Sequence, residues 1–155
     1  MNFSRLSTAL VLTLAAPYLA ASADRIEHIA TVTHPDLGEM SGLVASSYPG
    51  IYWVHNDSGD SARLFAIDLD GNVVIPSYIS ERDPNKWSGH AIDAAWNSDW
   101  EAIAMSDGVL YIADVGNNGN ARRDLGIYVV NEFHPEAIYK AVSYTHLTLP
   151  TSFLV

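Results

Sequence analysis

The stretch from Gly50 to Asp70 reads Gly-Ile-Tyr-Trp-Val-His-Asn-Asp-Ser-Gly-Asp-Ser-Ala-Arg-Leu-Phe-Ala-Ile-Asp-Leu-Asp and predicts a β-hairpin. Its first part, Ile51–Val54, is rich in the β-branched and aromatic residues that are typical of a buried strand. Residues 56–60 then predict a turn, because Asn, Asp and Gly tolerate the tight backbone dihedrals that a reversal needs. Arg63–Asp68 predicts the returning strand, and Asp70-Gly71 is a strong signal for the next hairpin turn.

The same order of strand, acidic turn, arginine and strand occurs a second time between Gly108 and Val130. Aligning the two copies places Ser41 against Glu101, Leu43 against Ile103, Tyr52 against Tyr111, and Asn56-Asp57 near Asp114. The two tyrosines are 59 residues apart, which exceeds the roughly 40–50 residues of common propeller repeats. We therefore expect two related β units, the first of which carries extra loop.

Composition narrows the classes of partner. The chain has 155 residues and no cysteine, with 18 acidic side chains against 8 basic ones and a net charge of −10. Disulfides and thiolate chemistry are therefore excluded, and nucleic acid or an anionic membrane surface is disfavoured because both need basic patches. The acidic excess is compatible with cation binding and equally with a role in solubility alone.

The N-terminus predicts export. Arg5 supplies a positive region, Ala9–Leu19 is mostly apolar, and Ala21-Ser22-Ala23 is a small-x-small cleavage site. The apolar run is shorter than the ~20 residues of a membrane span. We interpret residues 1–23 as a bacterial-type signal peptide and expect a periplasmic or extracellular mature chain that begins at Asp24, with no membrane span after cleavage.

The last residues, 141–155, differ from the rest because they carry no Asp, Glu, Lys or Arg and have no counterpart in either repeat. Val142–Thr151 resembles the translation of a transposase-type sequencing adapter, and a natural Thr/Leu strand is the alternative interpretation. We therefore expect residues 24–140 to be an incomplete domain whose natural gene continues.

The remaining segments of the mature part predict mainly strands. Ile26–Thr33 and Asn72–Ile79 are predicted strands, and the small residues of Met40–Ser46 suit an innermost strand. Residues 80–97 are too polar and irregular for a strand, and Trp87 and Trp96 are expected to hold this segment against the sheet. Because no longer helical period occurs, the predicted fold class is all-β.

Two phrases carry a resemblance to a known family. Met-Ser-Gly-Leu-Val-Ala … Ile-Tyr-Trp-Val-His-Asn-Asp-Ser-Gly-Asp and Asp-Trp-Glu-Ala-Ile-Ala … Leu-Tyr-Ile-Ala-Asp-Val-Gly-Asn-Asn resemble blades of exported bacterial β-propellers. The resemblance covers Glu39–Phe133 and is to the SdiA-regulated and esterase-like-phytase types, and more distantly to the NHL, strictosidine-synthase-like and gluconolactonase group. It implies a propeller of about six blades, often with a divalent cation, commonly calcium, in the central channel. The chain departs from the family in lacking the later blades.

Several oxygen-bearing side chains fall where blade loops would face such a channel. Hard cations such as calcium take six to eight carboxylate, amide or carbonyl oxygens, so the candidate ligands are Glu39, Asn56, Asp57, Glu101, Asp114 and Asn117. The alternatives are turn hydrogen bonds for the asparagines, and ion pairs of the turn aspartates with Arg63, Arg122 or Arg123. Among these candidates Glu101 is the strongest indication of a functional role, because a carboxylate inside an apolar strand is costly unless it is paired with a cation or binds a metal.

The sequence defines the chemistry of the chain less closely than it defines the fold. Motifs for a nucleophile elbow, a phosphate-binding glycine loop or a zinc site are missing from the sequence. His55 is better explained as a hydrogen-bonded histidine than as a general base. Two hypotheses follow: a calcium-assisted propeller that binds or hydrolyses a small or phosphorylated substrate at the channel mouth, and a non-catalytic propeller that binds an envelope protein or glycan.

Overall fold

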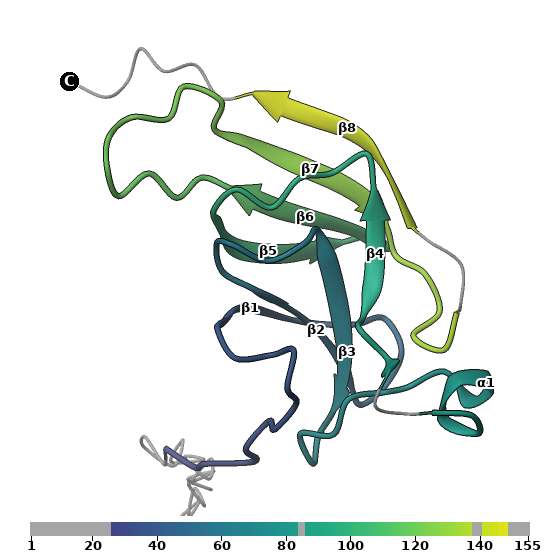
Figure 1. Ribbon diagram of the computed structural model, residues 1–155. Coiled ribbons are helices and arrows are strands. Elements are labelled where there is room, and N and C mark those ends of the chain that lie inside the picture. The colour runs from purple at the N-terminus through teal and green to yellow at the C-terminus, as the bar shows by residue number, and fades with distance from the viewer. Residues whose placement is uncertain (1–25, 84–85, 138–140, 149–155) are drawn as a thin grey trace, which may run out of the picture.

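The computed structural model describes residues 26–83, 86–137 and 141–148, and its fold is mostly β, as predicted (Figure 1). The elements are β1 (Met40–Ala45), β2 (Ile51–Asn56), β3 (Arg63–Asp68), α1 (Ser77–Ser80), β4 (His90–Asp93), β5 (Trp100–Ser106), β6 (Val109–Asp114), β7 (Gly126–Asn131) and β8 (Ala141–Thr148). The predicted signal peptide, residues 1–23, and positions 149–155 of the predicted adapter-derived tail lie outside the described residues.

The strands form two antiparallel groups that meet along one edge. The strand order is β1-β2-β3-β4-β8-β7-β6-β5, and the single parallel pair, β4 with β8, joins the groups. In Figure 1, β1, β2 and β3 lie below the layer of β5–β8, and β4 stands beside them. Strand β8 falls in the predicted tail, at the edge of β7. An open strand edge would pair with such an extended, Thr- and Val-containing segment whatever its origin.

Strand register confirms an internal repeat and corrects its alignment. Leu43 pairs with Val54 in the first unit, as Ile103 pairs with Ile112 in the second, and each lead-in strand has a bulge at its start. The predicted matches of Ser41 with Glu101 and Leu43 with Ile103 therefore hold. The match of Tyr52 with Tyr111 is wrong by one residue, because Trp53 is the structural equivalent of Tyr111.

The two tyrosines are misaligned because the two hairpin turns differ in length. β5 and β6 are joined by Asp107 and Gly108, which both have positive φ (50° and 74°), as in a two-residue type I′ turn. The equivalent turn of the first unit, between Ser46 and Ile51, is two residues longer. The sequence does not reveal this difference, because both turns end in glycine before an apolar run.

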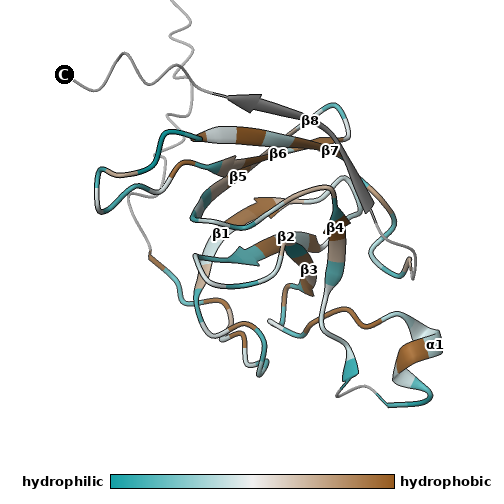
Figure 2. Ribbon diagram, turned by 45° about the horizontal axis from the view of Figure 1, so that its top comes forward, coloured by the Kyte–Doolittle hydropathy of each residue, from teal (hydrophilic) through white to brown (hydrophobic). Residues whose placement is uncertain are grey.

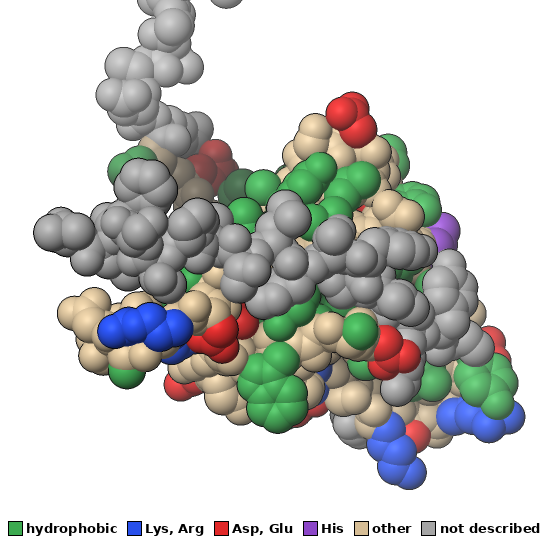
Figure 3. Space-filling view, turned by 90° about the horizontal axis from the view of Figure 1, so that it is seen from above, with side chains coloured by type: hydrophobic (Ala, Val, Ile, Leu, Met, Phe, Trp, Pro, Cys, Tyr) green, Lys and Arg blue, Asp and Glu red, His purple; other side chains and the backbone are tan. Residues whose placement is uncertain are grey.

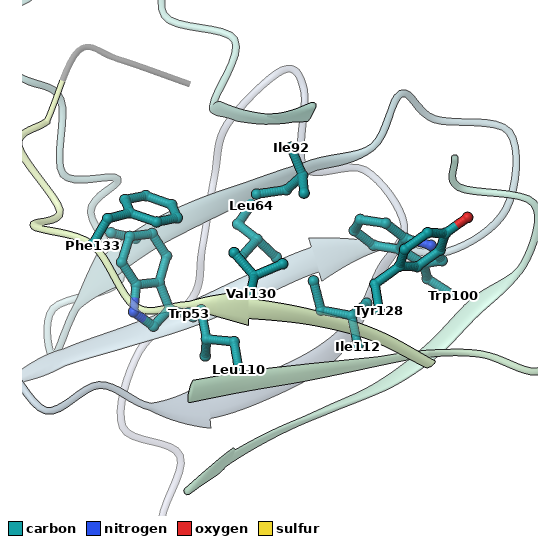
Figure 4. Close-up of a cluster of buried hydrophobic side chains, with 10 residues drawn as sticks. Trp53, Leu64, Ile92, Trp100, Leu110, Ile112, Tyr128, Val130 and Phe133 are labelled. Atoms are coloured by element: carbon teal, nitrogen blue, oxygen red, sulfur yellow. The ribbon is translucent and has the colours of Figure 1, made fainter. Parts of the chain in front are cut away.

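The two units pack against each other through opposite faces. We call the side of a unit that carries Trp53 and Ala66, or their equivalents Tyr111 and Val129, its front face, and the opposite side its back face. The front face of the first unit packs against the back face of the second, where the buried residues are Leu110, Ile112, Tyr128 and Val130. Figure 4 shows Trp53 and Phe133 at one end of this core and Trp100 and Tyr128 at the other.

Polar contacts also connect the units. The hydroxyl of Ser41 in β1 donates to the carbonyl of Trp100 in β5 over 2.9 Å, so the two lead-in strands lie beside each other. The indole Nε1 of Trp53 donates to Glu132 Oε1, just after β7, over 2.8 Å. Figure 2 shows the hydrophobic segments mainly on the strands, whereas the loop between β6 and β7 is largely hydrophilic.

Two predicted strands are not formed. Residues 26–33 run over the back face of the first unit without pairing, and Val32 packs against the buried cluster of Leu37, Val54, Phe65 and Ile67. In the segment 72–79 a single bridge, Ile67 with Val73, is formed before Pro76 precedes the short helix α1. Proline cannot donate to a β-ladder, which explains why pairing stops there.

The irregular segment 80–97 contains one strand that the sequence pattern did not predict. β4 is anchored by His90, whose buried ring lies among Trp53, Trp87 and Phe133 at centroid distances of 5.5, 4.7 and 5.0 Å. Trp87 thus holds the segment as predicted, whereas Trp96 leaves 73% of its surface exposed. Among the described residues, no helix has the length and apolar character needed to cross a membrane.

Candidate metal site

Three carboxylates converge where the first unit meets the second. Asp57 directly follows β2, Asp99 directly precedes β5, and Glu101 lies at the start of β5. One carboxylate oxygen from each lies within 4.8 Å of the others. Asp57 and Asp99 are half-buried, and Glu101 is exposed. The set is made entirely of oxygen donors, which fits a hard cation such as calcium.

Backbone and amide hydrogen bonds hold Asp57 in place. Its N–H donates to the carbonyl of Glu39 over 2.8 Å, which ties the end of β2 to the residue before β1. Its carbonyl accepts from Nδ2 of the buried Asn97 over 2.9 Å. Because Oδ1 of the same amide accepts from the N–H of Trp100 over 3.2 Å, Asn97 fixes the end of β2 relative to the start of β5.

The other two carboxylates are positioned by β5 and its neighbours. The N–H of Asp99 donates to Asp114 Oδ1 over 2.9 Å, and its carbonyl accepts from the N–H of Gly116 over 3.0 Å. Glu101 sits in the bulge between Trp100 and Ala102, where the register shifts. A bulge turns side chains out of the regular alternation and is a common way to aim a residue at a site.

Gly116 leaves the space that the carboxylates occupy. A Cβ atom added at this position would collide with Asp99 and would lie 2.6 Å from Glu101 Oε1. A larger residue here would therefore have to push the Asp99 and Glu101 side chains out of their present positions. Gly119, in the same loop, has open space around it, so the constraint is local to the carboxylate group.

Burial and neighbouring negative charge raise the pKa of two of these carboxyls, Asp99 and Glu101. The pKa of Asp99 is raised, first by desolvation and then by a hydrogen bond and the negative charge of Asp57, although the charge of Arg122 acts against this. The pKa of Glu101 is raised by desolvation and by the charges of Asp57 and Asp99. Like charges this close favour sharing a proton or binding a cation.

Asp114 takes part in an ion pair behind this group. Its Oδ1 accepts from Nη1 of Arg122 over 2.7 Å, and the carboxylate is almost completely buried. The same guanidinium donates to the carbonyl of Gly116 over 3.0 Å. The ion-pair alternative for this residue is therefore confirmed, and the parallel pair in the first unit joins Arg63 to Asp60 over 2.7 Å.

The two predicted asparagine ligands have structural partners, and Glu39 is not part of the carboxylate group. Asn56 is buried, and its Nδ2 donates to the carbonyl of Asp36 over 2.6 Å and to Asp60 Oδ2 over 2.7 Å. Asn117 Oδ1 accepts from the N–H of Arg122 over 2.9 Å, a turn hydrogen bond. Glu39 is exposed. Of the six predicted ligands, Asp57 and Glu101 thus lie together in the carboxylate group.

Asp99 was missed as a ligand, although a signal for it was present. It stands in the lead-in Asp-Trp-Glu, one residue from Trp100 and two from Glu101. Strand register makes it the equivalent of Glu39, which was chosen as a candidate. Applying the repeat to the candidate ligands would therefore have identified Asp99.

His55, next to Asn56, is a structural histidine. Its ring is fully buried, its Nδ1 lies 2.9 Å from the carbonyl of Asn56, and it packs edge-on against Trp100 at 5.5 Å. Burial lowers its pKa, which keeps the imidazole neutral near pH 7. Its ring is therefore enclosed in the core and not exposed to solvent.

Two clefts flank the turn after β2. One of about 240 Å³ is lined by Glu39, Asn56 and Arg63 among others, and one of about 460 Å³ by Trp96 and Asn97. On the face shown in Figure 3, acidic and hydrophobic side chains are mixed, and lysine and arginine lie towards the margin. This face offers no continuous basic patch among the described residues, which agrees with the charge balance of the sequence.

The comparisons with known proteins add no relative. No protein-family model, curated protein or solved structure matches the chain.

Proposed function

We propose that the chain contributes two neighbouring blades of an exported β-propeller and that Asp57, Asp99 and Glu101 bind a calcium ion at their junction. The convergence of these three carboxylates within 4.8 Å is the observation that carries the cation site. At this site the cation would supply positive charge and open coordination positions, which suit an oxygen-rich or phosphorylated ligand at the channel mouth.

The packing of the units supports the blade interpretation. Front-to-back packing relates one unit to the next by a rotation, and repeating that rotation generates a ring rather than a closed sandwich of two sheets. The neighbouring lead-in strands β1 and β5 correspond to the innermost strands of such blades. The carboxylates lie at the start of one of these strands, where a central channel would open.

Calcium titration of the purified protein tests the cation site. We expect calcium to raise the melting temperature, with stabilisation of about 2.7 kcal/mol at 100 times the dissociation constant. Asp99→Asn should abolish this effect. Asp107→Asn is the matched control, because Asp107 is an exposed aspartate at the other end of β5. Equal calcium stabilisation in wild type and Asp99→Asn would refute the site.

Acid should weaken calcium binding. Because the pKa values of Asp99 and Glu101 are raised, these carboxyls hold protons to a higher pH than isolated ones do. Calcium binding must release those protons, so the affinity should fall as the pH is lowered towards 5. Isothermal titration in two buffers of different ionisation enthalpy measures the proton release directly.

A non-catalytic binding propeller is the second candidate, and the state of His55 favours it. This histidine is enclosed and hydrogen-bonded, so it is not available to the carboxylate group as a general base. Phosphomonoester hydrolysis assays with and without calcium separate the two candidates. Calcium-dependent turnover that Asp99→Asn abolishes supports a hydrolase, and calcium binding without turnover supports the binding module.

Export belongs to the same proposal and has a simple test. Expression of the full chain in a bacterium, followed by fractionation and N-terminal mass spectrometry, should yield a periplasmic or secreted protein that begins at Asp24. A cytosolic protein that retains residues 1–23 would refute export.

A further inference from the structure

The backbone of Trp96 is fixed by two side chains of the second unit. Its N–H donates to the hydroxyl of Tyr128 over 3.1 Å, and its carbonyl accepts from Nε1 of Trp100 over 3.1 Å. Tyr128 and Trp100 are buried, whereas Trp96 leaves 73% of its surface exposed. A single exposed apolar side chain needs no explanation by itself, but this one extends from a fixed backbone position. The indole is therefore presented to solvent in a defined place.

The turn that leads to Trp96 has an uncommon backbone conformation. Ala94, two residues before it, has a φ of 62°, in the left-handed region that residues with a Cβ atom seldom adopt. Such conformations persist where the surrounding structure imposes them, and they are frequent at ligand-binding sites. The two hydrogen bonds at Trp96 hold this turn in place. An unfavourable turn and an exposed indole thus occur together, which favours a role in binding.

Trp96 forms one wall of a cleft of about 460 Å³, which we call the Trp96 cleft. Its volume lies within the range of about 300–1,000 Å³ that is typical of small-molecule sites. The apolar part of its lining consists of Ala62, Ile92 and Ala95, and the exposed Ser61 adds a hydroxyl group at the rim. An aromatic wall beside apolar side chains suits a ligand that has one flat apolar face.

The lining of the Trp96 cleft carries no unpaired charge. Asp60 is the only ionisable one among the described residues that line it, and its two oxygens accept from Arg63 over 2.7 and 2.8 Å. A cationic ligand finds no free carboxylate there, and one aromatic wall does not make the cage that quaternary ammonium groups need. An anionic ligand would meet the three carboxylates of the candidate metal site and the net charge of −10. A neutral ligand therefore fits the cleft best.

The Trp96 cleft adjoins the candidate metal site. Asn97 lines the cleft, and its Nδ2 donates to the carbonyl of Asp57 over 2.9 Å. The same side chain is buried and accepts from the N–H of Trp100, so it is a fixed wall between the two sites. A ligand that extends past Asn97 would meet the cation, which takes oxygen ligands such as hydroxyl groups.

We propose that the Trp96 cleft binds a neutral glycan, with a pyranose ring stacked on the indole of Trp96. A pyranose ring has a flat face of C–H groups and an edge of hydroxyl groups, so it matches an apolar wall beside a polar rim. An apolar peptide segment would use the wall but neither the rim nor the cation. The proposal rests on the binding-propeller candidate, for which it names the class of ligand, and the stacking contact itself does not require the cation.

Isothermal titration of the exported, processed protein with cellohexaose, chitohexaose and mannohexaose tests the proposal. These probes are neutral and differ in the group at carbon 2 of the ring. We expect at least one of them to bind with a dissociation constant below about 1 mM. Trp96→Ala should weaken this binding by about tenfold or more, whereas Trp96→Tyr keeps an aromatic face and should retain most of it. Tyr78→Ala is the matched control, since Tyr78 is exposed on α1 outside the cleft.

Acrylamide quenching of tryptophan fluorescence measures the stacking directly. Because Trp53 and Trp100 are buried, the exposed Trp96 should account for most of the quenching, and the bound oligosaccharide should reduce it. Circular dichroism melts confirm that each variant is folded.

Repeating the titrations with EDTA and with Asp99→Asn separates this proposal from the cation site. Glycan binding that persists under both conditions but is lost in Trp96→Ala supports the cleft even if the cation site fails. A wild-type protein that binds none of the three probes overturns the glycan proposal, whether or not it binds calcium. Unchanged glycan affinity in Trp96→Ala, or an equal loss in Tyr78→Ala, overturns it as well.

Discussion

Glu132 forms the main polar clamp between the units, and its removal should destabilise the fold measurably. The residue follows β7, and its carboxylate accepts from Trp53 Nε1 over 2.8 Å, from Ser46 Oγ over 2.5 Å and from the N–H of Ser47 over 3.1 Å. The Ser47 hydroxyl also donates to it. The clamp therefore joins the end of the second unit to the first turn of the first unit.

The magnitude of the effect follows from these hydrogen bonds. Hydrogen bonds to a charged group contribute about 1.5–3 kcal/mol each, and several bonds to one carboxylate are not additive. Glu132→Gln keeps the size but presents an amide group to donors, so at least one bond is lost. We expect a loss of about 2 kcal/mol, which lowers the melting temperature by about 8 °C for a domain of this size.

The pH dependence provides an independent check. Burial alone would raise the pKa of Glu132, but the hydrogen bonds from Ser46, Ser47 and Trp53 outweigh it and lower the pKa. A carboxylate with a lowered folded-state pKa stabilises the fold above its unfolded pKa of about 4.3. This stabilisation disappears as the pH falls through the folded-state pKa. The difference between wild type and Glu132→Gln should therefore shrink below about pH 4.

Urea unfolding followed by tryptophan fluorescence measures the free energy of unfolding of both proteins at several pH values. Glu136→Gln is the matched control, because Glu136 is an exposed glutamate four residues further on. If Glu132→Gln unfolds at the same urea concentration as Glu136→Gln, the clamp makes no net contribution and the reasoning is refuted. The same holds if the deficit persists unchanged at pH 3.

Two further predictions concern close packing. Gly116→Ala should abolish calcium binding by calorimetry, because its Cβ would displace Asp99, whereas Gly119→Ala in the same loop should bind as wild type does. His90→Phe should reduce acid sensitivity: burial lowers the pKa of His90 to about 4, so its protonation on unfolding removes up to about 3 kcal/mol as the pH falls from 6.5 to 4. Equal acid melting curves for His90→Phe and wild type would contradict this.

The strands of both units could be predicted from local pattern, because alternation and turn residues act over short distances. Arg63–Asp68 has the same bounds in the structure as in the prediction. β4 could not be predicted, since it depends on the burial of His90 among aromatic rings that come from distant segments. The failure of Asn72–Ile79 to form a strand was foreseeable, because Pro76 lies within it.

The predicted ion pairs were more accessible to sequence reasoning than the carboxylate group. Asp60 and Arg63 lie three residues apart, and Asp114 and Arg122 flank a single loop, so each pair forms within one unit. Asp57 and Asp99 are 42 residues apart in the sequence, and their contact depends on how one unit packs on the next. Alignment of repeats identifies equivalent positions, but it does not say which non-equivalent positions meet.

The position of the carboxylate group follows from the way in which the second unit packs on the first. In front-to-back packing, the end of β2 in one unit meets the start of the lead-in strand in the next, so Asp57 is brought to Asp99 and Glu101. The second unit has Val115 where the first has Asp57, because Asp114 is the equivalent of Asn56. The next junction of the same kind would therefore lack one of the three carboxylates. The site is thus a property of the pair of units, and the acid that distinguishes this junction is Asp57.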